Sequence, residues 1–114
     1  MSGRGVKRGV IVAKMKPGSE DDVAAIFAES DKTELPQLAG VKHRSLFVLD
    51  DVYIHYVETA EDFEAAVDEI REHPLFVDIS RRLDDHIAPY NPETWRSPKD
   101  ATAREFYSWD ADSS

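Results

Sequence analysis

The stretch that decides the fold is residues 41–58, VKHRSLFVLDDVYIHYVE, in which two apolar segments flank a pair of aspartates. Both segments are rich in the β-branched and aromatic residues that strands favour. Asp50-Asp51 fits a two-residue turn, although Asp-Asp is a weaker hairpin signal than Asn-Gly or Asp-Gly. The stretch therefore predicts a β-hairpin with strands at 41–49 and 52–58.

A two-residue turn also predicts the register of this hairpin. Leu46 should face His55 and Arg44 should face Val57, and cross-strand partners share one face of a sheet. Both predicted faces are largely apolar. The first carries Arg44, Leu46, Val48, Tyr53, His55 and Val57, and the second carries His43, Ser45, Phe47, Leu49, Val52, Ile54 and Tyr56. A slip of one residue would exchange the two faces.

Upstream of the hairpin, the pattern indicates a strand followed by a helix. Residues 9–16, GVIVAKMK, have strand composition, and Pro17-Gly18 ends them. Ser19 stands in a capping-box arrangement at the start of a helix. We expect this helix to end near Glu34, because Pro36 disfavours helical geometry in the residue before it.

Downstream of the hairpin, Thr59 is expected to cap a second helix, and Pro74 to begin a third one after His73. A short strand is predicted at 86–88, and residues 103–109, AREFYSW, also have strand composition. The order βαββα(α)β predicts an α+β, ferredoxin-like fold with a mostly antiparallel sheet and helices on one face. We expect one domain over residues 1–114, with a flexible N-terminus at 1–8 and a C-terminal extension at 90–114.

Composition excludes several classes of site. The 114 residues contain no cysteine, which removes disulfides, thiolate zinc sites, iron–sulfur clusters and a catalytic thiol. The four histidines do not stand in HxxxH or HExxH spacing, so no metal site is predicted.

Charge and hydropathy exclude several partners. Residues 1–16 hold five basic residues and no acidic one, so the rest of the chain sets all 23 acidic residues against nine basic ones. This strongly acidic part of the chain repels phosphate backbones, and we expect no nucleic-acid partner. No apolar run approaches the roughly 20 residues of a membrane span, and no signal peptide is apparent, so we expect a cytoplasmic protein without a membrane partner.

The second hairpin face predicts a homodimer. An antiparallel sheet with one face open to water should alternate apolar and polar residues, and this face does not. Helices in the predicted fold cover one face only, so a second copy of the chain is the expected cover. The contact is predicted to involve Phe47, Leu49, Val52 and Ile54.

The first hairpin face could line a small-molecule pocket. Arg44 and His55 lie on a diagonal that lets their side chains reach a shared ligand, and Tyr53 lies beside His55. A few polar groups among Leu46 and other apolar residues are typical of such pockets. Arg44 could equally pair with an acid, and His55 could be a core histidine that is satisfied by its neighbours.

Five segments resemble the tetracenomycin F2 cyclase family of bacterial type II aromatic polyketide cyclases, and together they span nearly the whole chain. They are FAESDKTELPQL at 27–38, GVKHRSLF at 40–47, DVYIHYVE at 51–58, HPLF at 73–76 and EFYSW at 105–109. The resemblance implies a ferredoxin-like homodimer of the dimeric α/β-barrel type that needs no cofactor. It implies intramolecular aldol-type ring closure, with dehydration, of a partly cyclised aromatic polyketide intermediate in antibiotic or pigment biosynthesis.

The resemblance also implies the catalytic residues. The family's acidic residue at the end of the first helix matches Asp31, its second-strand arginine matches Arg44, and its third-strand histidine matches His55. Ser30 stands where the family has a further histidine, so a hydroxyl replaces an imidazole. A histidine with a pKa near 6.5 could act as base and then as acid, and Arg44 could hold an enolate or carbonyl oxygen. We expect the substrate to contact Ser30, Tyr53, Phe27 and Leu46.

Two other functions remain open at this point. The chain could be a cofactor-independent monooxygenase of polyketide anthrones. It could also be a non-catalytic ligand-binding or accessory subunit that works with other type II polyketide synthase subunits, and the serine at position 30 keeps this alternative open.

Overall fold

The structure of the chain, a computed structural model, describes residues 7–90, 92–93, 101–109 and 111. The expected flexible N-terminus therefore lies mostly outside the described residues, and so does much of the expected C-terminal extension. In chain order the elements are β1 Lys7–Met15, α1 Glu20–Ser30, α2 Leu35–Ala39, β2 Val41–Leu49, β3 Val52–Thr59, α3 Phe63–Ile70, α4 Pro74–Leu83, β4 Ile87–Pro89 and β5 Thr102–Ala103.

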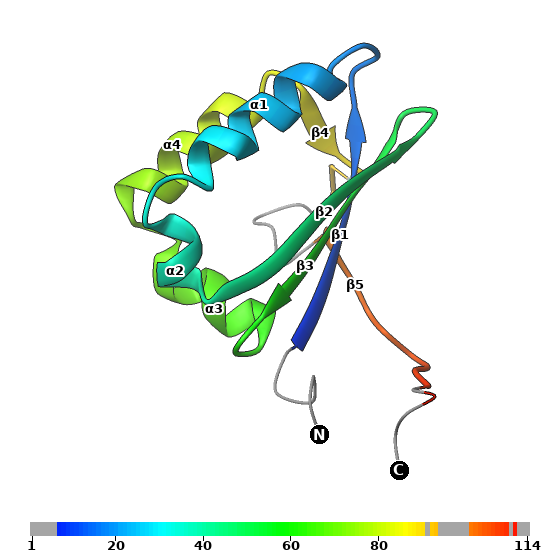
Figure 1. Cartoon of the computed structure of the whole chain (residues 1–114). Helices are drawn as coiled ribbons and strands as arrows, with labels where there is room; N and C mark the ends of the chain where they lie inside the picture. Colours follow the sequence, from blue (N-terminus) through cyan, green and yellow to red (C-terminus); the bar gives the residue numbers. More distant parts are fainter. Residues whose placement is uncertain (1–6, 91, 94–100, 110, 112–114) are drawn as a thin grey trace.

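The fold has two layers, a sheet and a set of helices that lie against one of its faces (Figure 1). The strand order is β2-β3-β1-β4, and β5 also pairs with β1. Each of these pairings is antiparallel. This arrangement agrees with the predicted βαββαβ order.

The hairpin has the predicted register. Leu46 faces His55 and Arg44 faces Val57, and an irregularity appears only beyond them, between Val41 and His43. Asp50, in the turn, has a φ of 55°. A two-residue turn thus determines which side chains of β2 and β3 point towards the helices.

The two faces of the sheet differ sharply in burial. On the face towards the helices, Tyr53, His55 and Val57 are all buried. On the opposite face, Phe47 is 56% exposed and Leu49 is 73% exposed. The helices therefore cover one face, and the apolar outer face has no cover within the described chain.

The first helix is shorter than predicted, because α1 ends at Ser30 rather than near Glu34. The Thr33 hydroxyl donates to the Ser30 carbonyl at 2.6 Å and accepts from the Leu35 amide at 3.1 Å. Such local side-chain bonds offer the backbone an alternative to helix continuation. Pro36 then lies in the first turn of α2, where proline is tolerated, instead of following the helix.

One predicted helix cap is in the right place without its hydrogen bond, and another is wrong. Ser19 is the N-cap residue of α1, as predicted, but its side chain makes no cap hydrogen bond, and its hydroxyl instead lies 3.1 Å from Nδ1 of His86. Thr59 remains in β3 with its hydroxyl donated to the Glu61 carbonyl, and Asp62 is the residue that caps α3. The predicted helix start after His73 is confirmed, because its Nδ1 accepts from the Leu75 amide at 3.1 Å.

The C-terminal strand is much shorter than the composition of 103–109 suggested. β5 comprises only Thr102–Ala103, and residues 104–109 have no regular secondary structure. The short strand predicted at 86–88 is present with a shift of one residue, as β4.

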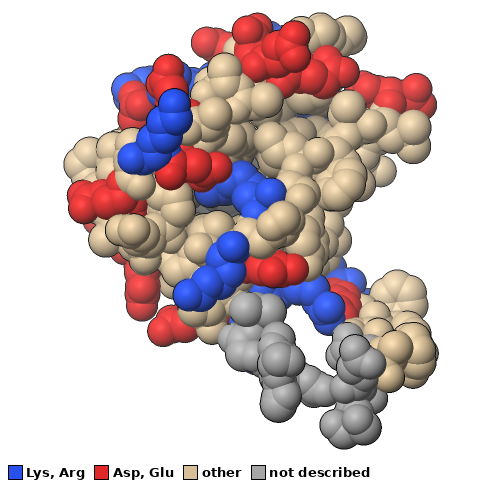
Figure 2. Space-filling model, in the orientation of Figure 1, with Lys and Arg blue, Asp and Glu red and all other residues tan. Residues whose placement is uncertain are grey.

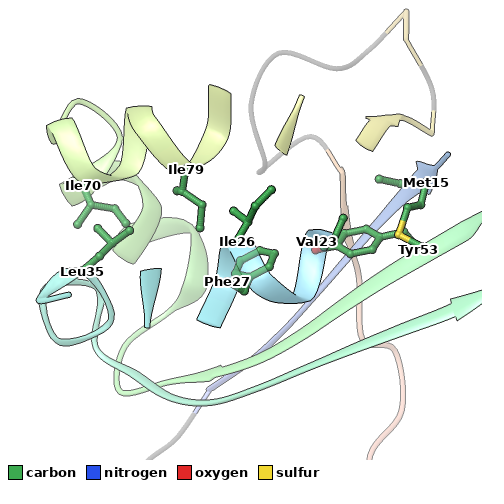
Figure 3. Packing of buried hydrophobic residues seen from close by; sticks show 9 residues of the cluster. Met15, Val23, Ile26, Phe27, Leu35, Tyr53, Ile70 and Ile79 are labelled. Atoms are coloured by element: carbon green, nitrogen blue, oxygen red, sulfur yellow. The ribbon is translucent and has the colours of Figure 1, made fainter. Parts of the chain in front are cut away.

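The hydrophobic core lies between the helices and the inner face of the sheet (Figure 3). Its buried members are Ala13, Met15, Val23, Ile26, Phe27, Leu35, Tyr53, Ile70 and Ile79. Among the described residues, no helix is long and apolar enough to cross a membrane. This layer of side chains surrounds the candidate site.

Candidate active site

A cavity of about 410 Å³ lies between the inner face of the sheet and the helices. Strands β1 to β4 and all four labelled helices contribute to its walls, which are mainly apolar. In Figure 2, basic atoms are visible in a recess near the middle of the displayed face. The polar residues of the walls are Ser30, Arg44, Tyr53, His55, Thr59, Ser80 and Asp84. Such a volume, with few polar groups, suits a small organic ligand.

Arg44 is the most highly connected polar group in the cavity wall. Its Nε donates to Oδ2 of Asp31 at 3.2 Å, and its Nη2 donates to Oδ1 of the same carboxylate at 2.7 Å. Its Nη1 lies 3.1 Å from Nε2 of His55. The guanidinium carbon lies 4.9 Å from the centre of the Phe27 ring. A forked ion pair and an aromatic face together fix the orientation of this cation.

Burial and the contact with Arg44 together determine the protonation state of His55. A guanidinium can donate but cannot accept a hydrogen bond, so we assign Nε2 as the acceptor and place the ring proton on Nδ1. Burial, followed by the positive charge of Arg44, lowers the pKa of His55 from 6.5 to about 3. The imidazole is therefore neutral at physiological pH, and the expectation of a pKa near 6.5 is wrong.

Asp31 acts on the cavity through Arg44. It is the residue directly after α1, its side chain is 41% exposed, and it does not line the cavity. Helix α1 has no basic residue in its last turn. The C-terminal end of a helix favours positive charge, and the guanidinium of Arg44 supplies that charge next to the Asp31 carboxylate.

Three of the four expected substrate contacts line the cavity. These are Phe27 and Ser30 of α1 and Tyr53 of β3. Leu46 does not line it, because its side chain packs against the hydrophobic core cluster instead. Phe27 is shared between the core and the site, since its ring also contacts the His55 ring edge-on at 5.1 Å.

Tyr53 is a buried residue whose hydroxyl makes no hydrogen bond within the described part of the chain. The residue is 4% exposed and lines the cavity. Burial raises the pKa of Tyr53 well above its usual value, more than the charge of Arg44 lowers it. The phenol therefore stays protonated and can donate a hydrogen bond to a ligand.

Ser30 lies in the wall between the main cavity and a smaller pocket. It is 8% exposed, lines the main cavity, and also lines a small pocket of about 60 Å³ between α1 and α4. A serine is much smaller than the histidine that the family resemblance places here. Its hydroxyl can donate or accept, but it cannot carry a proton as an imidazole does.

Several wall residues were not found by the sequence analysis. Ser80 and Asp84 are four residues apart near the end of α4, and this spacing places them on one face of a helix. Asp84 belongs to a run of two aspartates, a pattern that is typical of a solvated surface. Ala66 and Val67 of α3 form part of a helical apolar stripe, which does not reveal whether it faces a packed core or a void.

No group of three His, Asp or Glu side chains in the described residues is arranged to hold a metal ion. The polar groups at the centre of the site are a cation, a carboxylate and a neutral imidazole. Such a set can polarise and hold an oxygen-rich organic ligand, and can exchange protons with it.

Comparison with known proteins identifies relatives of the whole domain. Residues 7–110 match the family described as polyketide synthesis cyclase. An uncharacterised protein of Streptomyces coelicolor is 49% identical over 102 residues, covering 89% of this chain and 92% of that protein. The polyketide synthase CurG of Streptomyces cyaneus is 46% identical over 103 residues, covering 90% and 96%. Tetracenomycin F2 cyclase of Streptomyces glaucescens is 40% identical over 104 residues, covering 91% and 94%.

Two solved structures are also similar. The structure of tetracenomycin F2 cyclase, a type II polyketide cyclase, matches with a TM-score of 0.84 over 92% of this chain and 98% of that one. A dimeric protein of unknown function from Bacteroides fragilis, with a ferredoxin-like fold, matches with a TM-score of 0.51 at 13% identity over 74% and 88%. The second likeness concerns the fold alone, and the predicted α+β ferredoxin-like class is confirmed.

Proposed function

Because this chain belongs to the polyketide synthesis cyclase family, we propose that it closes a ring by aldol-type condensation and loss of water. The substrate is a partly cyclised aromatic polyketide, and no cofactor takes part. The chain is a polyketide cyclase and therefore an enzyme. The observation that carries the proposed chemistry is the guanidinium of Arg44, held between Asp31 and His55 in the wall of a largely apolar cavity.

The first role of Arg44 is to bind a substrate oxygen. Aldol closure removes a proton from a carbon between two carbonyls, and the negative charge of the resulting enolate accumulates on oxygen. The carbon then attacks a second carbonyl, a new carbon–carbon bond forms, and the charge passes to an alkoxide. A cation held in position inside an apolar cavity stabilises both oxyanions without having to reorganise.

His55 is the proposed proton carrier. Its Nε2 lone pair is occupied by Nη1 of Arg44 at 3.1 Å. A substrate oxygen that takes over Nη1 would free this lone pair next to the reacting carbon. The negative charge that develops on the substrate oxygen offsets the charge of Arg44, which helps to lower the pKa of His55 in the free protein, so Nε2 can accept the carbon-bound proton and return it to the alkoxide. Loss of a second carbon-bound proton and of the hydroxyl completes the release of water and leaves the ring aromatic.

Asp31 and Phe27 are proposed to hold Arg44 in place. Asp31 binds Nε and Nη2, which leaves Nη1 directed at the interior of the site. Phe27 packs against both the guanidinium and the imidazole. A poly-β-carbonyl substrate is intrinsically reactive, so a cavity that holds it in one geometry contributes much of the rate.

Ser30 is proposed to line the cavity rather than to transfer protons. It stands where the resemblance places a histidine, so proton transfer falls to His55. A hydroxyl in the cavity wall can still bind a phenol or carbonyl oxygen of the substrate.

The working unit is proposed to be a homodimer. The outer face of the sheet carries Phe47 and Leu49, which are 56% and 73% exposed, together with the half-buried Val52 and Ile54. A contiguous apolar face of this kind is characteristic of an interface, and a second copy supplies a complementary surface through a two-fold axis.

Mass spectrometry of the product formed from a partly cyclised polyketide tests the proposed reaction. Purified protein should convert the substrate into a species lighter by one water. A gain of oxygen under air would instead identify an anthrone oxygenase. No change with the protein alone, together with an altered product when a ketosynthase partner is present, would identify an accessory subunit. Either of these results would overturn the proposal.

A further inference from the structure

The two ends of the cavity differ in chemistry. Figure 3 shows Leu35 and Ile70 at one end of the core layer, Phe27 in the middle and Tyr53 at the other end. We call the first the α2–α3 end. Besides Leu35 and Ile70, it is lined by Thr59, Ala66 and Val67. The hydroxyl of Thr59 is already donated to the Glu61 carbonyl, so this end presents an apolar surface to a ligand.

The opposite end, which we call the α4–β4 end, retains polar groups that can meet a ligand. It is lined by Tyr53, Ser80 and Asp84, together with Ala13, Leu83, Ile87 and Pro89. The side chain of Tyr53 is buried and lines the cavity, and its hydroxyl makes no hydrogen bond among the described residues, so it is available to a ligand. The centres of the Tyr53 and His55 rings lie 6.5 Å apart, so this donor is next to the Arg44–His55 pair.

A partly cyclised aromatic polyketide has the same asymmetry. Its fused rings are flat and largely apolar, while its uncyclised chain carries carbonyl oxygens that accept hydrogen bonds. Burial of the rings at the α2–α3 end gains the most from the hydrophobic effect. A chain that passes Arg44 can also reach the Tyr53 hydroxyl and accept a hydrogen bond from it.

We propose that the substrate lies lengthwise in the cavity, with its fused rings at the α2–α3 end and its uncyclised chain along Arg44 and Tyr53. Ala66 and Val67 then determine specificity, because the size of their side chains limits how many fused rings fit beyond the reacting carbon. This orientation rests on the proposed function for the identity of the substrate, but it can be tested without turnover.

The test uses 2-naphthol, which has two fused aromatic rings, one hydroxyl and no carbonyl chain. In NMR titrations of the unmodified protein, the methyl signals of Ala66 and Val67 should shift in a saturable manner, while those of Leu83 and Ile87 at the other end should not. Saturable shifts confined to Leu83 and Ile87 would overturn the orientation, and so would the absence of saturable binding. Neither result would bear on whether the enzyme removes water from its substrate.

Substitution provides a second readout for the same probe. Ala66→Leu fills part of the α2–α3 end and should weaken the binding of 2-naphthol at least tenfold. Ala65→Leu makes the same change at an exposed position of the same helix and should leave the Kd unchanged. Equal Kd values for Ala66→Leu and the unmodified protein would contradict the proposal.

Discussion

At the scale of single residues, the site depends on the combination of a permanent cation with a neutral imidazole. The side chain of Arg44 is only 16% exposed. A charge that is this buried needs a partner, and the carboxylate of Asp31 provides one by accepting two hydrogen bonds from the guanidinium. Lysine cannot reproduce this arrangement, because an ammonium group lacks the planar set of donors that binds a carboxylate and a second acceptor at once.

The depressed pKa of His55 predicts how stability depends on pH. The unfolded chain protonates this histidine near pH 6.5 and the folded chain only near pH 3, so the unfolded state binds more protons between these values. Stability should therefore be complete above about pH 6.5 and decrease as the pH falls. The contribution of His55 to the loss between pH 7 and pH 5 is about 2 kcal/mol.

Urea unfolding at pH 7 and pH 5 measures this contribution. His55→Gln keeps an acceptor for Arg44 but removes the titrating group, so its free energy of unfolding should depend less on pH than that of the unmodified protein. His43→Gln is the matched control, because His43 is exposed on the outer face. If His55→Gln and His43→Gln lose equal stability on acidification, the buried neutral state of His55 is wrong.

Sequence reasoning located Arg44 and His55 but misjudged the chemistry of His55. The register of a two-residue turn was enough to put both on one face, and the structure confirms that register. The pKa depends on burial by residues such as Phe27, which is distant in sequence. No local pattern carries that information.

At the scale of elements, the hairpin turn is a point of backbone strain. Asp50 has a φ of 55°, a left-handed conformation that is unfavourable for residues other than glycine and, less so, asparagine and aspartate. Asp50→Gly should therefore raise the free energy of unfolding by about 0.5 kcal/mol. Asp51→Gly should lower it, since residue 51 lacks a positive φ and its carboxylate lies 3.5 Å from Nζ of Lys14. Denaturant melts of the two variants that reverse this order would contradict the turn geometry.

The order of the strands and of the main helices could be predicted, but most of the helix ends could not. Alternating and helical apolar patterns identified the elements of the βαββαβ order. The ends depend on which partner a small polar side chain chooses. Thr33 bonds the backbone on both of its sides, and Thr59 bonds the Glu61 carbonyl instead of capping α3.

At the scale of the whole molecule, the outer face of the sheet determines the assembly. Leu49→Asp places a charge at the 73%-exposed apolar position of the proposed interface and should convert the dimer to a monomer. Val77→Asp places the same charge at a 43%-exposed position on α4 and should leave the dimer intact. Multi-angle light scattering at micromolar concentration distinguishes these outcomes, and an unmodified protein that is already monomeric would defeat the proposed dimer.

The cavity is a property of the whole fold that no segment predicts. Its walls combine residues from β1 to β4 and from every labelled helix. The apolar stripe of α3 has the same sequence pattern whether it packs against other side chains or lines a cavity. For this reason the sequence indicated the polar centre of the site but not its apolar end.

The most direct test is the initial rate of water loss from a partly cyclised polyketide, measured for Arg44→Ala beside the unmodified enzyme. The variant should be slower by about 10²- to 10³-fold, the range seen when a donor to a developing oxyanion is removed. Arg82→Ala breaks a comparable ion pair, with Glu29 at 2.8 Å, away from the main cavity, and should keep nearly the full rate. Equal rates for Arg44→Ala and the unmodified enzyme would contradict ring closure at this site.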